Sequence, residues 1–219
     1  MWNSQVIIML LEGIRDTLYM TLASTLFGYI IGLPMGIVLT VTDKDGIRPN
    51  AVVYKVLDVI SNLLRSIPFI ILLIVLIPFT RFVVGRSYGS TATIVPLTIA
   101  AAPYIARMVE SSLKEVDAGV IEAARSMGAS DFQIVTKVML VEARTSLIVG
   151  ATISLGTILG YSAMAGTVGG GGLGDIAIRY GYTRWQTDIM VVTVVLLVIL
   201  FQIFQTIGMK IANRLDRRK

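Results

Sequence analysis

A run of glycines is the first feature of this sequence whose residue types and spacing could do chemistry. The segment GGGGLG spans positions 169–174, and its glycines are Gly169, Gly170, Gly171, Gly172 and Gly174. The first, third and last of them have the spacing G-x-G-x-x-G, which is typical of a loop that holds a dinucleotide phosphate when a strand precedes it and a helix follows it. Asp175 comes next, where a phosphate-binding P-loop has a lysine. The elements on either side of the run therefore decide its role.

Other residue types that carry catalytic or metal chemistry are scarce. The chain has no cysteine and no histidine, so it lacks disulfides, Cys-based metal sites and the commonest general base. No clustered acid, base or metal-ligating group stands out. We expect no catalytic residue, metal ligand or cofactor in this chain, and an intramembrane enzyme such as a lipid-modifying hydrolase is disfavoured.

The composition is that of a membrane protein. Of the 219 residues, 55% are hydrophobic and 15% are charged, against about 25% charged in an average soluble domain. The mean hydropathy is +0.79. The net charge of +5 does not indicate nucleic acid, because membrane proteins collect Lys and Arg in their cytoplasmic loops. We expect an all-α, polytopic membrane protein.

Five charge-free stretches are candidate spans, since a bilayer core needs roughly 20 apolar residues of helix. They are 17–42, 66–80, 87–106, 145–174 and 189–209. The second is short and can extend back through 59–64, with Arg65 near the membrane surface. The fourth is too long for one span, so its glycine-rich end is expected beyond the helix. A membrane helix instead of a strand then precedes the glycine run, which removes the context that a phosphate cradle needs.

The basic residues predict the orientation of the chain. The segments 42–66, 104–146 and 208–219 carry 14 of the 19 Lys and Arg residues, and such residues concentrate on the cytoplasmic side. We therefore expect a multi-pass membrane protein with its N-terminus outside and its C-terminus in the cytoplasm. The glycine run then lies outside, between the fourth and fifth spans.

Small residues and missing charges characterise the spans themselves. Gly28, Gly32 and Gly36 repeat every four residues and place bare backbone on one face of the first span, which favours close helix packing in lipid. Glycine is also simply common in membrane helices. No span has an unambiguous charged residue at its centre, which disfavours a transporter driven by protons.

The longest loop, 107–144, predicts a helix, a sharp turn and a second helix on the cytoplasmic side. Four apolar residues have the spacing i, i+1, i+4, i+7 of one helix face, and they are Val120, Ile121, Ala124 and Met127. Gly128 suits a left-handed turn, and Ser130 with Gln133 fits a capping box. This segment is too small to bury its apolar face alone. It either lies on the bilayer and its own spans or is received by a soluble partner.

Several motifs resemble one transporter family. Glu122, Ala123 and Ala124, followed by Gly128, resemble the EAA---G signature of the permease subunits of ABC transporters. That motif usually continues to I-x-L-P, whereas this chain has VMLV at 138–141 and lacks the proline. The blocks RSIPFIILL (65–73), VPLTIAAAPYIARMVE (95–110) and GYSAMAGTVGGGGLG (160–174) are similar to the methionine-importer permease of this superfamily. The resemblance covers most of residues 15–210.

The resemblance implies a fold, a function and a set of partners. It implies one type I permease domain over 1–219, with a core of about 15–210 and a coupling segment of about 116–141. Two copies of the chain would assemble with two cytoplasmic ATPase subunits, an external substrate-binding (lipo)protein and membrane lipid. ATP and Mg would be bound by the ATPase, and methionine, in the L form and also the D form, would cross by alternating access. The family resemblance also implies that the membrane is the bacterial cytoplasmic (inner) membrane. The residues expected to carry the coupling are Val120, Ile121, Glu122, Ala123, Ala124, Met127 and Gly128.

The translocation path is expected near the outer end of the fourth span. Tyr161, Ser162 and Met164 lie just before the glycines, which we interpret as the outer rim where the binding protein delivers its cargo. A flexible thioether such as Met164 suits a gate that seals and repacks, although a Met is more often plain packing. Alternative functions are import of another amino acid or a small polar metabolite, and a stand-alone channel or scaffold.

Overall fold

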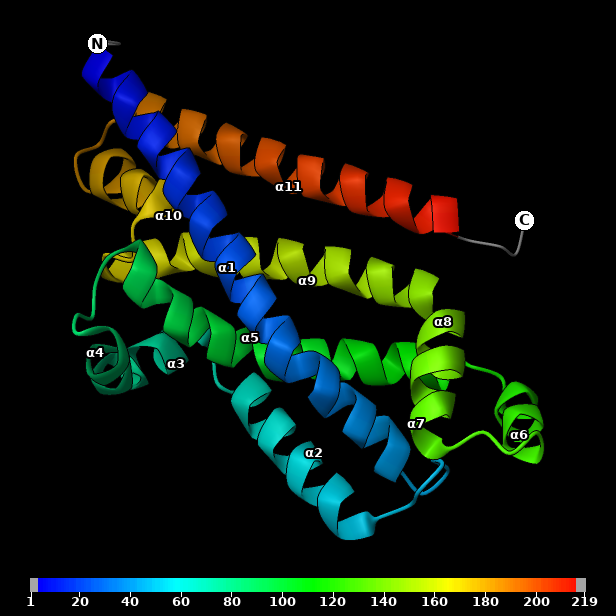
Figure 1. Ribbon diagram of the computed structural model, residues 1–219. Helices are drawn as coiled ribbons and strands as arrows, with labels where there is room; N and C mark the ends of the chain where they lie inside the picture. The colour runs from blue at the N-terminus through cyan, green and yellow to red at the C-terminus, as the bar shows by residue number, and fades with distance from the viewer. Residues whose placement is uncertain (1–3, 216–219) are drawn as a thin grey trace.

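Long helices dominate the computed structural model, which describes residues 4–215 (Figure 1). Four helices are long and apolar enough to cross a membrane. They are α1 (Ser4–Thr42), α5 (Ser90–Lys114), α9 (Arg144–Ala165) and α11 (Thr187–Leu215). The helices α2 (Ala51–Ser66) and α3 (Phe69–Val75) pass the same test only together, as a bent pair, so there are five candidate spans when this pair counts as one. The expected all-α membrane fold with about five spans is confirmed.

The second span, expected over 66–80 with an extension back through 59–64, is divided into two helices. The helices α2 and α3 meet at an angle of 103°, and Ile67 between them has an extended backbone with ψ of 125°. Pro68 is the cause, because a proline disfavours the helical conformation of the residue before it. The short helix α4 (Ile77–Val84) follows with Pro78 in its first turn.

Two other helix boundaries also differ from those expected from the sequence. The helix α1 begins at Ser4 and not near residue 17, so the charged residues at 12, 15 and 16 lie within it. The helix α5 continues through Pro103 to Lys114, so the first residues of the expected loop 107–144 are helical. In contrast, α9 ends at Ala165, before the glycine run, as the sequence indicated.

The central helix is α5. Within its most apolar stretch 67% of the residues are buried, compared with 11% for α11. The helix α1 crosses α5 along Gly28, Gly32 and Gly36, which are all buried. A Cβ at Gly32 would lie 2.6 Å from the Ala102 carbonyl oxygen, and one at Gly36 would lie 2.5 Å from that of Ala106. The glycine stripe therefore lets two backbones touch directly.

The outer helices expose apolar side chains to their surroundings. On α1, Leu26 and Ile30 are each 60% exposed, and on α11 Val191 is 55% exposed. A soluble protein rarely exposes such a continuous apolar surface. These faces are suited to contact lipid or a second membrane helix.

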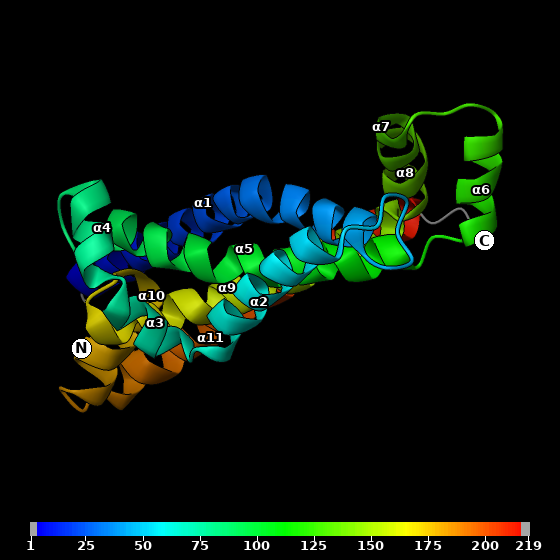
Figure 2. The same cartoon turned by 90° about the horizontal axis from the view of Figure 1, so that it is seen from below.

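The connecting segments gather at opposite ends of the bundle. One end carries α6 (Ala118–Ser126), α7 (Asp131–Gln133), a π-helix (Ile134–Met139) and α8 (Leu140–Glu142). The other end carries α4, a 3-10 turn (Gly166–Val168), α10 (Gly172–Ile176) and a second π-helix (Ala177–Tyr182). Figures 1 and 2 both show α6 projecting from its end, apart from the long helices.

Candidate functional site

The turn after α6 is built by Gly128. Its backbone is left-handed, with φ of 82°. Its N–H donates to the carbonyl of Arg125 at 3.0 Å, and the N–H of Ala129 donates to that of Ala124 at 3.1 Å. These two bonds form a Schellman motif, which closes a helix and reverses the chain. The sharp turn expected at Gly128 is confirmed.

The next helix begins with the expected capping box. The Ser130 N–H donates to Oε1 of Gln133 at 2.9 Å, and the Gln133 N–H donates to Oγ of Ser130 at 3.3 Å. The helical chain then continues through the π-helix and α8 to Ala143, where α9 starts in a new direction (Figure 1). Ala143 is buried, and it makes the bend without the proline that the signature usually has.

The four apolar residues of α6 do not share one environment. Ala124 is buried and Ile121 is half-buried, and both pack on a core cluster that includes Ile134 of the π-helix. Val120 is 42% exposed and Met127 is 82% exposed. Glu122 and Ala123 are also exposed. One face of the helix therefore packs against the rest of the protein, and the other face leaves apolar and small residues exposed.

The helix α6 is attached to the bundle at few points. Arg125 donates from Nη2 to the carbonyl of Ile47, in the loop between α1 and α2, at 2.8 Å. A pocket of about 430 Å³ separates α6 from that loop, and another of about 420 Å³ separates it from the start of α9. A short helix that projects between two open pockets offers a surface that a partner protein can contact.

A buried cluster of charges lies at the base of this projection. The Glu110 side chain is 6% exposed and accepts from Arg107 at 2.7 Å and from Lys114 at 2.8 Å. Arg107 also pairs with Asp58 of α2, and Lys114 pairs with Asp43 at 2.6 Å. The cluster joins α5 to α2 and to the loop after α1, and it satisfies a carboxylate that would be costly to bury alone.

Sequence reasoning missed this cluster because it placed residue 107 in a loop. The spacing of Arg107, Glu110 and Lys114 puts all three on one face of a helix. This spacing is the feature of the sequence from which the cluster could have been predicted.

Two further groups complete the charge cluster. Tyr54 of α2 donates to Oε1 of Glu110 at 3.3 Å, and the bond from Lys114 lowers the pKa of Asp43.

At the opposite end the glycine run is packed into the bundle. Gly169, Gly171 and Gly172 have φ between 75° and 83°, and Gly172 and Gly174 are buried. A Cβ at Gly174 would overlap the backbone of Ala163 in α9. The glycines therefore allow close backbone contact, and a helix, not a strand, precedes them.

Hydrogen bonds tie the same segment to two spans. The Leu173 N–H donates to Oγ1 of Thr17 in α1 at 2.9 Å. The Gly89 N–H, just before α5, donates to the Gly169 carbonyl at 2.9 Å. The segment thus closes this end of the bundle.

The three residues expected to line a path have different surroundings. Tyr161 and Met164 lie on one face of α9, three residues apart. Met164 is 46% exposed, and the Tyr161 ring stacks on Phe69 of α3 with centroids 4.6 Å apart. Ser162 is 1% exposed, and its hydroxyl donates to the Leu159 carbonyl at 2.8 Å. Ser162 therefore packs behind the face that carries the other two.

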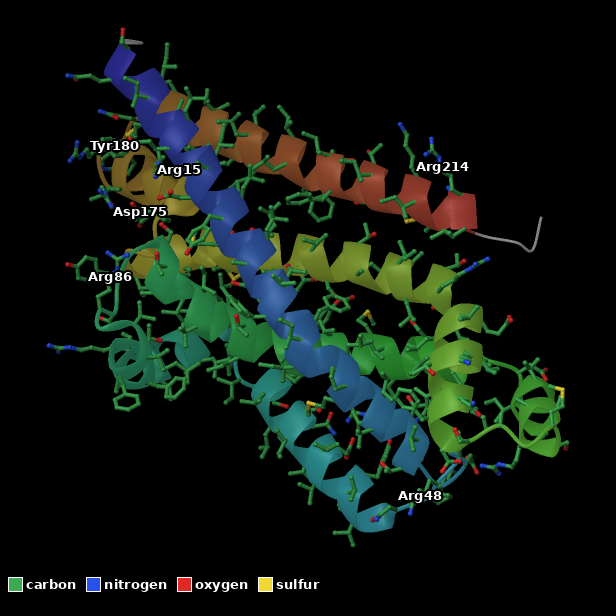
Figure 3. The ribbon with its side chains drawn as sticks, in the orientation of Figure 1. Arg15, Arg48, Arg86, Asp175, Tyr180 and Arg214 are labelled. Carbon is green, nitrogen blue, oxygen red and sulfur yellow. The ribbon has the colours of Figure 1, made fainter. Side chains whose placement is uncertain are left out.

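The charged residues separate between the two ends. Figure 3 shows Arg15, Arg86 and Asp175 at the end of the glycine run, and Arg48 and Arg214 at the end of α6. This agrees with the two groups of segments that the sequence distinguished. The basic residues at 217, 218 and 219 lie outside the described residues.

Comparisons with known proteins agree with these features. The family model described as "Binding-protein-dependent transport system inner membrane component" matches residues 19–219. The "Probable D-methionine transport system permease protein MetI" of Vibrio cholerae is 48% identical over 210 residues, which cover 96% of this chain and 93% of the relative. The "D-methionine transport system permease protein MetI" of Escherichia coli is 54% identical over 158 residues, or 72% of this chain and 73% of the relative.

Solved structures have the same fold. A chain of the "MetNI methionine ABC transporter" in inward-facing conformations matches with a TM-score of 0.97 and 50% identity, over 99% of this chain and 100% of that one. A chain of an amino acid ABC transporter crystallised with histidines matches with a TM-score of 0.78 and 19% identity, over 96% of this chain and 95% of that one. The second likeness concerns the fold alone.

Proposed function

This chain belongs to the family of binding-protein-dependent transport system inner membrane components, and we propose on that premise that it is the membrane-spanning permease subunit of an ATP-driven methionine importer. The observation that carries the proposal is the match at 50% identity and a TM-score of 0.97 to nearly all of a methionine transporter chain. The named relatives, which transport D-methionine, support cargo in the D form as well as the L form.

The proposed assembly has two copies of this chain, two cytoplasmic ATPase subunits and an external substrate-binding protein. A two-fold pair is the commonest closed symmetry for identical subunits. The exposed apolar faces of the outer helices supply surface for the second copy and for lipid. ATP and Mg are bound by the ATPase, and this chain is not itself an enzyme. The domain extends over 1–219.

The projecting helix α6 is the proposed contact with the ATPase. The uncovered residues Val120, Ala123 and the C-cap residue Met127 enter the ATPase, and the exposed Glu122 in the middle of the helix offers a carboxylate. When ATP draws the two ATPase subunits together, the two α6 helices move with them. Arg125 and the buried charge cluster transmit this motion to the loop after α1, to α2 and to α5, and the bundle changes from inward-facing to outward-facing.

The end with the glycine run is the proposed outer rim. There the binding protein releases its cargo, and the half-exposed Met164 acts as the gate of the path. The N-terminus then lies outside the cytoplasmic membrane and the C-terminus inside. The positive-inside count and the separation of the charged residues between the two ends support this orientation.

Uptake of labelled methionine by the complete transporter in proteoliposomes tests the proposal. We expect accumulation that requires ATP, the binding protein and this chain together. Accumulation of another amino acid in place of methionine would change the cargo and keep the importer. Methionine flux that is independent of ATP would replace the importer with a channel.

A further inference from the structure

The break between α2 and α3 lies partway along the bundle, on its exposed side (Figure 1). Figures 1 and 2 both show α2 ending level with the middle part of α5, far from the end that carries α6. The non-helical residues Ile67 and Pro68 thus lie at membrane depth. Irregular backbone is tolerated there only when it is buried in protein or borders a water-filled cavity. Broken membrane helices of this kind often form substrate sites near the midplane.

A pocket of about 190 Å³ opens at this break. Residues from four helices line it, among them Arg65 of α2, Phe69 of α3, Tyr104 of α5 and Tyr161 of α9. Tyr104 is near the midpoint of its helix. Pockets that hold drug-sized ligands measure roughly 300–1,000 Å³, so this one is suited to a smaller molecule such as a single amino acid.

Arg65 is the only charged residue lining this pocket, and the structure leaves it without a partner. Among residues 4–215 it forms no ion pair and no hydrogen bond, and its side chain is exposed. Arg65 is expected near the membrane surface from the sequence, and the structure places the end of α2 that carries it beside the middle part of α5 (Figure 1). A charge at this depth is costly against lipid and marks a path or a binding site.

The remaining walls of the pocket fit the rest of an amino acid. The rings of Phe69 and Tyr161 are stacked at an angle of 4° and offer an apolar, polarizable surface, which a thioether contacts favourably. The Tyr104 hydroxyl, whose oxygen is 3.4 Å from Oγ1 of Thr157, adds a polar group to the wall. The carbonyls at the C-terminal end of α2 favour a positive group such as an α-ammonium.

We propose that this pocket is a substrate site halfway along the path, where Arg65 binds the α-carboxylate of an amino acid and the Phe69–Tyr161 pair holds its apolar side chain. This assignment rests on the proposed function as an amino-acid importer. A guanidinium can hold a carboxylate with two parallel hydrogen bonds, which a lysine cannot reproduce. The site gives the permease a recognition step of its own, separate from that of the binding protein.

The test compares wild-type transporter with the Arg65→Gln and Arg65→Lys variants, using Arg214→Gln as a matched control on the exposed end of α11. Uptake of labelled methionine is measured in proteoliposomes, and ATPase activity reports assembly. We expect Arg65→Gln to lower uptake at least about tenfold, because the α-carboxylate loses a charged, two-pronged hydrogen-bond donor. Arg65→Lys should recover part of it, and Arg214→Gln should stay near wild type.

A second readout separates recognition from a structural role. Labelled methionine is bound to the solubilised permease–ATPase complex in the absence of the binding protein. Unlabelled methionine and methionine amide are then compared as competitors that displace the labelled methionine. The wild type should prefer the carboxylate over the amide, and Arg65→Gln should lose this preference. Tyr161→Leu, which keeps the arginine, should weaken binding of both competitors and retain the preference.

The outcomes distinguish the two proposals. If the wild type imports methionine and Arg65→Gln keeps both the uptake rate and the preference for the carboxylate, the site is wrong and the importer stands. If Arg65→Gln does not assemble, unchanged methionine binding by Tyr161→Leu overturns the site. If the wild type imports no methionine, the proposed function fails first.

Discussion

Two glycines of this chain have the same conformation and the same open surroundings but lie at opposite ends. Gly85 and Gly128 both have φ of 82°, and a Cβ at either would meet nothing within 4 Å. A β-branched residue in this left-handed region costs roughly 1–2 kcal/mol. Substituting each of these two glycines in turn therefore separates the effect of local backbone strain on transport from the effect of the position of the residue.

Gly128→Val is predicted to uncouple ATP hydrolysis from uptake, because it distorts the turn that orients α6. The protein should still reach the membrane, and ATPase activity should persist while methionine uptake falls at least about tenfold, equivalent to roughly 1.4 kcal/mol. Gly85→Val carries the same strain and should transport normally. Equal transport by the two variants, measured in vesicles, would remove the coupling role from α6.

Met164→Ala is predicted to raise the basal leak of methionine or the ATPase rate in the absence of binding protein. Shortening this half-exposed side chain opens space where we place the gate. Met209→Ala on α11, where the side chain is 38% exposed, is the control for loss of a methionine facing lipid. Wild-type leak and ATPase rates in Met164→Ala would assign Met164 to packing.

At the scale of elements, the buried charges hold α5, α2 and the first loop together. Glu110→Gln removes the negative charge that Arg107 and Lys114 share and one of its two acceptor oxygens, and breaking a buried ion pair costs roughly 3 kcal/mol or more. The melting midpoint in detergent should fall by at least about 5 °C. Asp45→Asn breaks a pair whose side chains are 84% and 83% exposed, and it should leave the midpoint unchanged. If Glu110→Gln melts with the wild type, the cluster does not stabilise this junction.

The contact between α1 and α5 gives a second prediction at this scale. Gly32→Ala inserts a methyl group against the Ala102 carbonyl and should separate the helices and lower the melting midpoint. Gly160→Ala, in α9, adds a methyl group where nothing lies within 4 Å. It should keep or raise stability, since Ala exceeds Gly in helix propensity by about 1 kcal/mol. An equal response of the two variants would contradict close packing along the stripe.

At the scale of the whole molecule, the orientation can be measured directly because the chain has no cysteine. Phe132→Cys and Tyr182→Cys place single thiols at exposed positions of opposite ends, where the native side chains are 76% and 67% exposed. A membrane-impermeant maleimide should label Tyr182→Cys in cells with a permeabilised outer membrane and Phe132→Cys only in inverted vesicles. The reverse pattern would invert the proposed topology, and labelling of both from one side would contradict it.

The sequence by itself determined the features that depend on neighbouring residues. Apolar length identified the membrane helices, the four-residue glycine repeat marked a packing face, and Ser130 with Gln133 predicted a cap that the structure contains. These signals are local, because helices form through bonds and side-chain pairs only three or four residues apart. The coupling motif was located differently, by its resemblance to the EAA---G signature of ABC permeases.

Only the tertiary structure decided which distant residues meet and at what depth. Asp43, Asp58 and Glu110 join one charge cluster although more than ten positions separate each from the next. Arg65 lies beside Tyr104 and Tyr161 because the chain bends by 103° after α2. Burial and charge pairing depend on which helices pack against one another. The periodicity of apolar residues along the chain does not indicate which helix will be the neighbour. The same packing turned the glycine run from a possible phosphate loop into a close contact between spans.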